Sequence, residues 1–332
     1  MKTTNCTMLL SGSLLLSAVL TSGSVFAQTS DYVAGRTADG QPDLQGVWTN
    51  ETITPMERPA SLAGRAFLSD DEIAALERRV AERRADADNN VAIEPGGDVG
   101  AYNQIWLDSG DTVLSTGQTS LIVDPANGRA PIRASAAAVR DYNFAHVEDH
   151  YVHHTVWDRC ISRGVPGSML PAGYNNAYRI IQSKESITIV YEMIHDVRVI
   201  PLTKQQHLDP RIRLWMGDSV AHWDGDTLVV ETTNFNSRGM IASSAAGGRL
   251  KGVPVTEELQ VVERFTRTSA DTIIWEARIS DPQIYTQPFT ISMPLTRDSE
   301  YVMYEYACHE GNHAIPNILG AGRASERQQA AQ

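Results

Sequence analysis

The hydrophobic period of the chain changes along its length. From about residue 100 onward, apolar and polar residues alternate over short runs, the period of strands with one buried face. The runs predicted as strands are Thr119–Val123, Ala177–Gln182, Ser186–Leu202, Ser219–Trp223, Thr227–Asn234, Glu257–Thr266, Thr272–Ser280, Tyr285–Met293 and Glu300–Ala307. Several are joined by short polar turns, as in an antiparallel meander. We therefore expect a mainly β fold, a large antiparallel β-barrel or strongly curved, lipocalin-like sheet, with a β-sandwich as the alternative.

Helical period is confined to shorter stretches. Residues 69–72 (Ser-Asp-Asp-Glu) form a capping box, and the apolar residues behind it predict an amphipathic helix over 70–86. A second helix is expected over Ala134–Asp149, and a short strand over Gln45–Thr49. The predicted organisation is an irregular N-terminal region with one helix (28–100), an antiparallel β domain (101–323) and a disordered tail (324–332).

The first 27 residues have the pattern of a secretory signal. Lys2 precedes an uncharged stretch with an apolar centre, and a small-x-small pattern ends at Ala27, where we expect cleavage. The mature protein is therefore expected in the periplasm or outside the cell. No later segment is long and apolar enough to suggest membrane insertion.

Charge and motifs exclude several classes of function. The chain has a formal net charge of −12, and loss of Lys2 makes the mature form more negative. Such a surface repels phosphate backbones, so no nucleic-acid partner is expected. There is no βαβ rhythm and no glycine-rich phosphate loop, so we expect no nucleotide and no other cofactor.

Two cysteines, Cys160 and Cys308, remain after Cys6 leaves with the signal. An even pair in an oxidising compartment indicates a disulfide; two separate thiols are the alternative.

The Asp224-Gly225 pair predicts a tight β-hairpin. If these two residues form the loop, Asp218 lies directly opposite Glu231, and His222 shares their face. Two facing carboxylates repel, so an enclosed pair would hold one raised pKa and could supply a general acid. The alternative is a solvent-exposed face, with Trp223 and Leu228 in the core.

Charged residues also interrupt the apolar run 186–202. Glu192 or His195 is a candidate general base, with Arg198 nearby as a substrate-binding group. The alternative is a buried ion pair of Arg198 with Glu192 or Asp196.

The loop before the 177–182 strand offers amides and phenols. Tyr174, Asn175, Asn176 and Tyr178 are donors suited to a sugar or phenolic oxygen, although ordinary turn chemistry explains them equally. Ser168 lacks the strand-turn-helix context of a nucleophile elbow.

Four histidines, His146, His150, His153 and His154, invite a metal hypothesis. Their spacing does not match the His-Glu-x-x-His order of metalloproteases, so no metal site is expected.

Several segments together resemble a broad family of secreted bacterial proteins without an assigned activity. They are Asp43–Asn50, Thr119–Pro125, Asp158–Gly167, Glu192–His195, Gly225–Phe235 and Ala307–Asn312. The resemblance spans most of the mature chain and implies export and one continuous domain. His153, His154 and His222 depart from the family's pattern.

The sequence thus predicts an exported, metal-independent lyase, hydrolase or isomerase acting on a small aromatic, terpenoid or glycoside molecule. The expected catalytic residues are Glu192, His195, Asp218, His222 and Glu231. The expected substrate-binding residues are Tyr174, Asn175, Asn176, Tyr178, Arg198 and Trp223. The alternatives are a non-catalytic, lipocalin-like small-molecule binding protein, which needs an apolar cavity, and a structural envelope protein, which needs no pocket.

Overall fold

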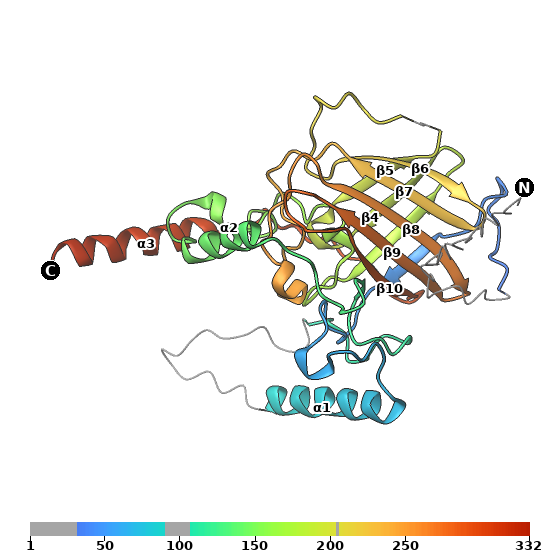
Figure 1. The fold of residues 1–332 in the computed structure, drawn as a ribbon, viewed down its shortest axis with the longest axis horizontal. Helices are drawn as coiled ribbons and strands as arrows, with labels where there is room; N and C mark the ends of the chain where they lie inside the picture. The colour runs from blue at the N-terminus through green and yellow to red at the C-terminus, as the bar shows by residue number, and fades with distance from the viewer. Residues whose placement is uncertain (1–31, 90–106, 204–205) are drawn as a thin grey trace, which may run out of the picture. The chain divides into compact units, whose positions relative to one another are not determined.

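The computed structural model describes residues 32–89, 107–203 and 206–332. Within this part, the strands form one antiparallel sheet that curls into a nearly closed barrel (Figure 1). They are β1 (Gly46–Thr49), β2 (Ile122–Asp124), β3 (Ala177–Gln182), β4 (Ser186–Tyr191), β5 (Val197–Pro201), β6 (Asp218–Asp224), β7 (Thr227–Thr233), β8 (Gln260–Ser269), β9 (Thr272–Ser280) and β10 (Phe289–Arg297). The predicted mainly β, barrel-like fold is confirmed; the predicted signal lies outside the described residues.

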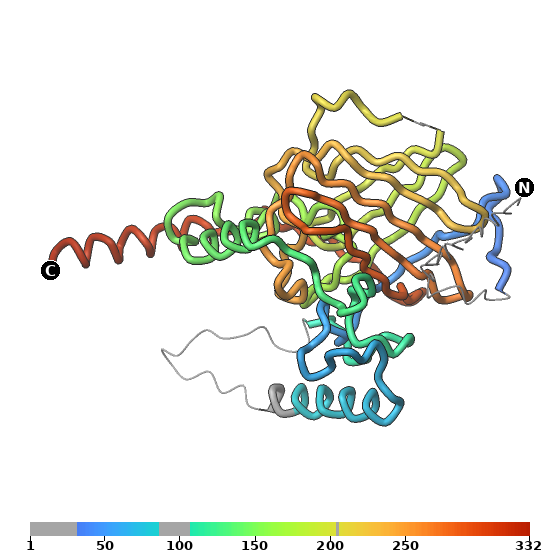
Figure 2. The backbone as a smooth tube through the Cα atoms, viewed as in Figure 1, coloured from blue at the N-terminus to red at the C-terminus, as the bar shows by residue number. Residues whose placement is uncertain are grey.

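The barrel has one seam without a backbone ladder. The strand order is β5-β4-β3-β1-β10-β9-β8-β7-β6, with β2 paired to β10 beyond this path. The two end strands, β5 and β6, lie side by side, yet no ladder of hydrogen bonds joins them. The connection between them arches outside the barrel wall (Figure 2). Closure of the barrel at this seam therefore depends on side chains.

Side chains fill the lumen. Along β8 and β9 every second residue is buried, as expected for strands with one face inward. The largest fully buried side chains of the strands are Trp48, Trp275, Tyr178, Tyr191, Phe265 and Phe289. Since these aromatic rings occupy the interior, the lumen is a packed core.

The α-helices of the described residues lie outside the sheet: α1 (Asp70–Asn89), α2 (Ala134–Ala145) and α3 (Ala314–Ala330). The predicted capping box starts α1, because the Ser69 amide donates to Glu72 Oε2 at 2.9 Å and the Glu72 amide donates to Ser69 Oγ at 3.4 Å. None of the described helices is long and apolar enough to cross a membrane.

Three segments differ from the prediction. The run predicted as one strand over Ser186–Leu202 is two strands, β4 and β5, separated by a tight loop at 192–196. The segment Glu300–Ala307 joins no strand ladder, although its residues alternate. Residues 324–330, where a disordered tail was expected, continue helix α3, whose small and long-chain residues favour a helix.

The β6–β7 hairpin has the predicted faces but not the predicted pairs. Asp224 lies opposite Thr227, so the loop residues are Gly225 and Asp226. Gly225 has φ +60°, and a turn with glycine first needs no left-handed conformation at an aspartate. As a result, Asp218 pairs with Thr233 and Glu231 pairs with Val220; the direct Asp218–Glu231 pair was wrong.

Gly217 is required where the chain enters β6. Its φ is +69°, and a Cβ there would lie 2.5 Å from the Thr233 carbonyl oxygen. We expect Gly217→Ala to lower the free energy of unfolding by roughly 2–3 kcal/mol. The matched control is Gly225→Ala, since Gly225 has φ +60° but open space around its Cβ position, and it should cost only about 1 kcal/mol. Urea unfolding measures both, and equal losses would contradict a steric role for Gly217.

Candidate functional site

The loop between β4 and β5 places one carboxylate at the end of the barrel. Glu192 follows β4 directly, and only 1% of its surface is exposed. The turn is tight because the next residues, Ile194 and His195, have left-handed φ values of 65° and 47°. A positive φ is rare for a β-branched residue such as isoleucine, and such outliers concentrate at functional sites.

A segment after β10 lies against this loop. We name residues 298–313 the C-terminal strap. The Tyr301 hydroxyl donates to the two oxygens of Glu192 at 2.9 and 3.0 Å, and the Tyr304 amide donates to Glu192 Oε1 at 3.0 Å. His195 Nδ1 lies 2.9 Å from the Tyr306 carbonyl oxygen. Glu192 and His195, both predicted, therefore meet a strap that the sequence did not associate with them.

Two further carboxyl groups lie near Tyr301. Burial raises the pKa of Asp108, although the Asn176 amide groups that donate to it at 3.0 Å act in the opposite direction. Burial and the charge of Asp108 raise the pKa of Glu51. Because Glu51 is exposed, solvent partly screens its interaction with Asp108. Burial and the bond to Glu192 raise the pKa of Tyr301, with smaller contributions from Asp108 and Glu51. The Tyr301 phenol therefore keeps its proton at neutral pH. The neighbouring carboxyl groups of Asp108 and Glu51 keep their protons to a higher pH than usual.

An aromatic cluster adjoins these groups. The ring centroids of Trp157 and Tyr174 are 5.9 Å apart, and those of Tyr174 and Tyr306 are 6.0 Å apart. These rings are half-buried and pack against Met193 and Ile194 of the tight loop. We call this set, Trp157, Tyr174 and Tyr306, the aromatic cluster.

The predicted amides have structural partners here. Asn176 is buried, and its side chain bonds the Asp108 and Ala172 backbones. Asn175 has a left-handed φ of 53°. Together with Tyr174 they shape the loop before β3, and this loop holds Asp108 through the bonds of Asn176.

The predicted disulfide is confirmed. Cys160 and Cys308 are bonded, with a Cα–Cα distance of 5.5 Å. The bond joins the strap to the 155–163 loop, and the Asn312 side chain adds a bond to the Asp158 carbonyl oxygen at 3.2 Å.

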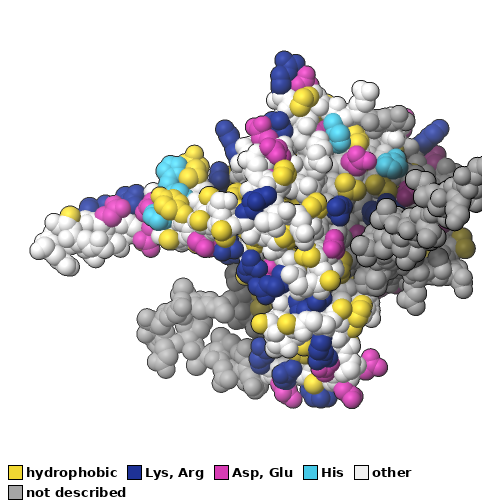
Figure 3. All heavy atoms as spheres, in the orientation of Figure 1, with side chains coloured by type: hydrophobic (Ala, Val, Ile, Leu, Met, Phe, Trp, Pro, Cys, Tyr) yellow, Lys and Arg dark blue, Asp and Glu magenta, His cyan; other side chains and the backbone are white. Residues whose placement is uncertain are grey.

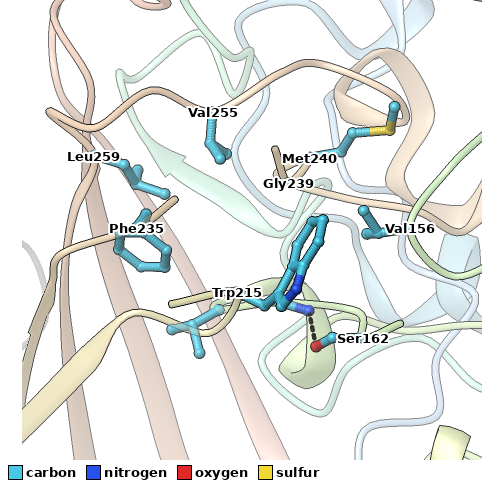
Figure 4. Close-up of a pocket in the computed structure, with 10 residues that line it drawn as sticks. Val156, Ser162, Trp215, Phe235, Gly239, Met240, Val255 and Leu259 are labelled. Atoms are coloured by element: carbon cyan, nitrogen blue, oxygen red, sulfur yellow. Dashed lines mark hydrogen bonds between the residues drawn. The ribbon is translucent and has the colours of Figure 1, made fainter. Parts of the chain in front are cut away.

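A small cavity lies on the other side of the tight loop. Its volume is about 10 Å³, room for roughly one water molecule. Its walls are Val156, Ser162, Gly164, Val165, Trp215, Phe235, Gly239, Met240, Val255 and Leu259, with the Trp215 indole among apolar side chains (Figure 4). Ser162 Oγ accepts from the Gly164 amide and donates to Asp196 Oδ2, each at 2.8 Å. Burial raises the pKa of Asp196, while Ser162 lowers it.

Four predicted residues lie elsewhere. Asp218 is buried at the start of β6, where Oδ2 is 3.0 Å from His207 Nδ1 and accepts from the Leu208 amide at 2.8 Å. His222 and Glu231 are exposed on the outside of the barrel, and Trp223 packs against the core. The alternative of a solvent-exposed hairpin face therefore describes His222 and Glu231.

Two predicted binding residues lie inside the barrel. Tyr178 is fully buried, with its ring edge toward Tyr191 at a centroid distance of 6.2 Å. Arg198 forms a buried ion pair with Glu263 at 2.6 Å, so Glu192 and Asp196 were the wrong partners. This ion pair crosses the barrel interior, so the positions of Arg198 and Glu263 in the sequence do not predict it.

One group of histidines lies on the surface around α2, beside hydrophobic side chains, and others lie on the barrel (Figure 3). The rings of Tyr142 and His146 stack at 3.9 Å, and the centroids of His146 and His153 are 6.2 Å apart. His154 instead is buried and bonds the Val147 carbonyl oxygen at 2.7 Å. Within residues 32–89, 107–203 and 206–332, no group of three or more metal-ligating side chains is placed to hold an ion.

The chain matches no family model, no curated protein and no solved structure. Its site therefore has to be interpreted from its own geometry. The sequence analysis missed Tyr301, Asp108 and Arg163. Arg163 lies within the segment Asp158–Gly167, which was noted only for its resemblance to a family, and Tyr301 lies within the predicted strand Glu300–Ala307. Nothing in the sequence marked Asp108.

Proposed function

We propose that the protein is an exported enzyme that uses side-chain acid/base chemistry on a small organic molecule at the end of the barrel. The observation that supports it is the Tyr301 phenol, bonded to the buried Glu192 carboxylate with Asp108 and Glu51 close by. Of these groups, Tyr301, Asp108 and Glu51 have raised pKa values, and such convergence of titratable groups is typical of active sites. The signal pattern and the disulfide support export.

The geometry fits a concerted proton transfer. Glu192 accepts the phenolic proton while the Tyr301 oxygen takes a proton from the substrate, so no free phenolate is needed despite its raised pKa. Asp108, in its protonated form, can return a proton to a developing oxyanion or leaving group. Lyase and isomerase reactions use this pair of steps, and in a hydrolase reaction the first proton would come from the attacking water molecule instead of the substrate.

A carrier of the lipocalin type is less well supported. Such a carrier needs an open lumen, whereas the aromatic side chains of Trp48, Trp275 and Tyr178 occupy this one.

Substrates can be found by a thermal-shift screen of the secreted protein against aromatic, terpenoid and glycoside libraries, with product analysis of each hit. With a converted substrate, we expect Glu192→Gln and Tyr301→Phe to lower kcat at least about 100-fold, because each removes the proton-transfer partner of the other. Steady-state kinetics measures the change.

Matched controls are Glu185→Gln, an exposed carboxylate in the β3–β4 turn, and Tyr142→Phe, an exposed phenol on α2. Both should leave kcat within about twofold of the wild type.

Activity should also fall as pH rises through the raised pKa of Asp108, and Asp108→Asn should remove this decrease from the pH profile of kcat. Unchanged turnover in Glu192→Gln would exclude this mechanism, and stabilisation by ligands without conversion of any hit would favour a carrier.

A further inference from the structure

Arg163 is a buried cation without a described counter-charge. Only 3% of its surface is exposed. Its Nη2 donates to the carbonyl oxygens of Leu170 at 2.9 Å and Pro171 at 3.5 Å, and its Nε has no hydrogen-bond partner. Among the ion pairs of the described residues, none includes Arg163.

This arrangement is costly. A buried charge without a partner of opposite sign destabilises a fold, and an apolar residue of similar size would cost less. The contrast within the same barrel is Arg198, which is equally buried but pairs with Glu263. Burial lowers the pKa of Arg163 to about 10, and only the phenols of Tyr174 and Tyr178 act in the opposite direction. A ligand that carries a negative charge would therefore supply the counter-charge that Arg163 lacks.

The surroundings of Arg163 favour a flat ligand. Its Cζ lies over the Trp157 ring, 6.0 Å from the ring centre, so the guanidinium adjoins the aromatic cluster. The three rings of the cluster are half-buried and so reach the surface. The buried Tyr178 hydroxyl, whose pKa the Arg163 charge and the Asn50 side chain lower in part, has no acceptor for its own proton within hydrogen-bond distance. Arg163 and Tyr178 thus each have an unpaired donor, and the two residues lie close to one another.

We propose that Arg163 and the aromatic cluster bind an aromatic carboxylate, which is the acid group of the substrate. The inference rests on the proposed enzymatic function and specifies its substrate class. A carboxylate oxygen would accept from Arg163 Nε and the Tyr178 hydroxyl, a charge-assisted arrangement, while the ring packs against Trp157 and Tyr174. Repulsion from the Glu192 carboxylate would turn the acid group away from the proton-transfer residues and so orient the substrate.

Entry of such a ligand requires the rings to move apart. Tyr306 belongs to the C-terminal strap, whose residues 301–307 join no strand ladder. Side-chain contacts to Glu192 and His195, together with the disulfide, hold the strap in place. A ring on this segment can shift without breaking the sheet.

The test compares 4-fluorobenzoate with 4-fluorobenzamide, a neutral molecule of nearly equal shape. Fluorine NMR titration of the purified protein at constant ionic strength gives both dissociation constants. We expect the carboxylate to bind at least tenfold more tightly than the amide. Arg163→Met should weaken carboxylate binding at least tenfold and leave amide binding nearly unchanged, and Arg163→Lys should restore part of the loss.

The comparison in the wild type alone is decisive if Arg163→Met does not fold. Equal affinity for the two molecules, or no binding of either at millimolar concentration, would overturn the proposal. Full carboxylate binding by folded Arg163→Met would also overturn it. Glu192→Gln should keep the binding, so a failure of this inference is distinguishable from a failure of the proposed catalysis.

Discussion

Replacing Arg198 with methionine is expected to lower the free energy of unfolding by roughly 3–5 kcal/mol, the cost of leaving a buried charge without its partner. Glu263 is fully buried, and the Arg198 guanidinium lies 2.6 Å from its Oε2. Burial alone would lower the pKa of Arg198, but the Glu263 carboxylate and the Tyr191 phenol together outweigh it and raise the pKa above its ordinary value. Urea unfolding with a checked m-value measures the loss.

The reason for so large an effect is the position of Arg198 at the seam. Its Nη2 donates to Ser219 Oγ on β6 at 3.0 Å and to Thr232 Oγ1 on β7 at 2.8 Å. Together with Glu263 on β8, these contacts join β5 to the far side of the seam, where no backbone ladder is present. The side-chain network therefore closes the barrel in place of main-chain hydrogen bonds.

A double-mutant cycle separates the ion pair from the packing. Glu263→Gln keeps an acceptor for the Trp275 indole, whose Nε1 donates to Glu263 Oε1 at 3.2 Å. Arg198→Met combined with Glu263→Gln should be more stable than the sum of the single losses predicts, because neither charge is then left unpaired. Arg36→Met is the surface control: the Arg36–Asp226 pair is also 2.6 Å long but about half exposed, and its loss should cost less than about 1 kcal/mol. Similar losses at the two sites would show that burial does not control this interaction.

The sequence predicts the parts of this fold that depend on local pattern. Alternation over β8 and β9 places every second residue in the core, and the capping box at Ser69 starts α1. The disulfide was predicted from the even number of cysteines left after the predicted signal, and the structure confirms it. In each case the information lies within a few residues or in a count.

The prediction fails where backbone conformation or long-range packing determines the structure. The loop at 192–196 contains neither glycine nor proline, so its left-handed Ile194 is invisible in a run that reads as one strand. The Asp224-Gly225 pair marks a hairpin, but either Gly225-Asp226 or Asp224-Gly225 could form the loop, and the register differs between them.

The candidate site shows the same division. Glu192 stands out in the sequence as a charge in an apolar run, while its partner Tyr301 is 109 residues away. The seam residue Arg198 also stands out, but its partner Glu263 faces it only once the barrel has closed. A single sequence therefore identifies half of each pair.

Removing the disulfide is expected to cost roughly 5 kcal/mol, because Cys160 and Cys308 close a loop with a sequence separation of 148 residues in the unfolded chain. The variant with both cysteines replaced by alanine avoids a free thiol and a buried hydroxyl. Urea unfolding of this variant, and of the wild type after reduction, should give the same lowered midpoint. A midpoint equal to that of the oxidised wild type would contradict the expected stabilisation.

The same variant connects stability to the site. The bond fixes the C-terminal strap, which carries Tyr301 and Tyr306, to the 155–163 loop that carries Trp157. Without it, the strap is held by Glu192, by His195 and by the Asn312 bond to the Asp158 backbone. Amide hydrogen exchange should therefore increase over residues 301–313 well before it increases in β8 and β9, whose ladders do not involve the disulfide. If exchange rises equally in both regions, the disulfide stabilises the barrel as a whole, and the strap has no independent freedom to admit a ligand to the aromatic cluster.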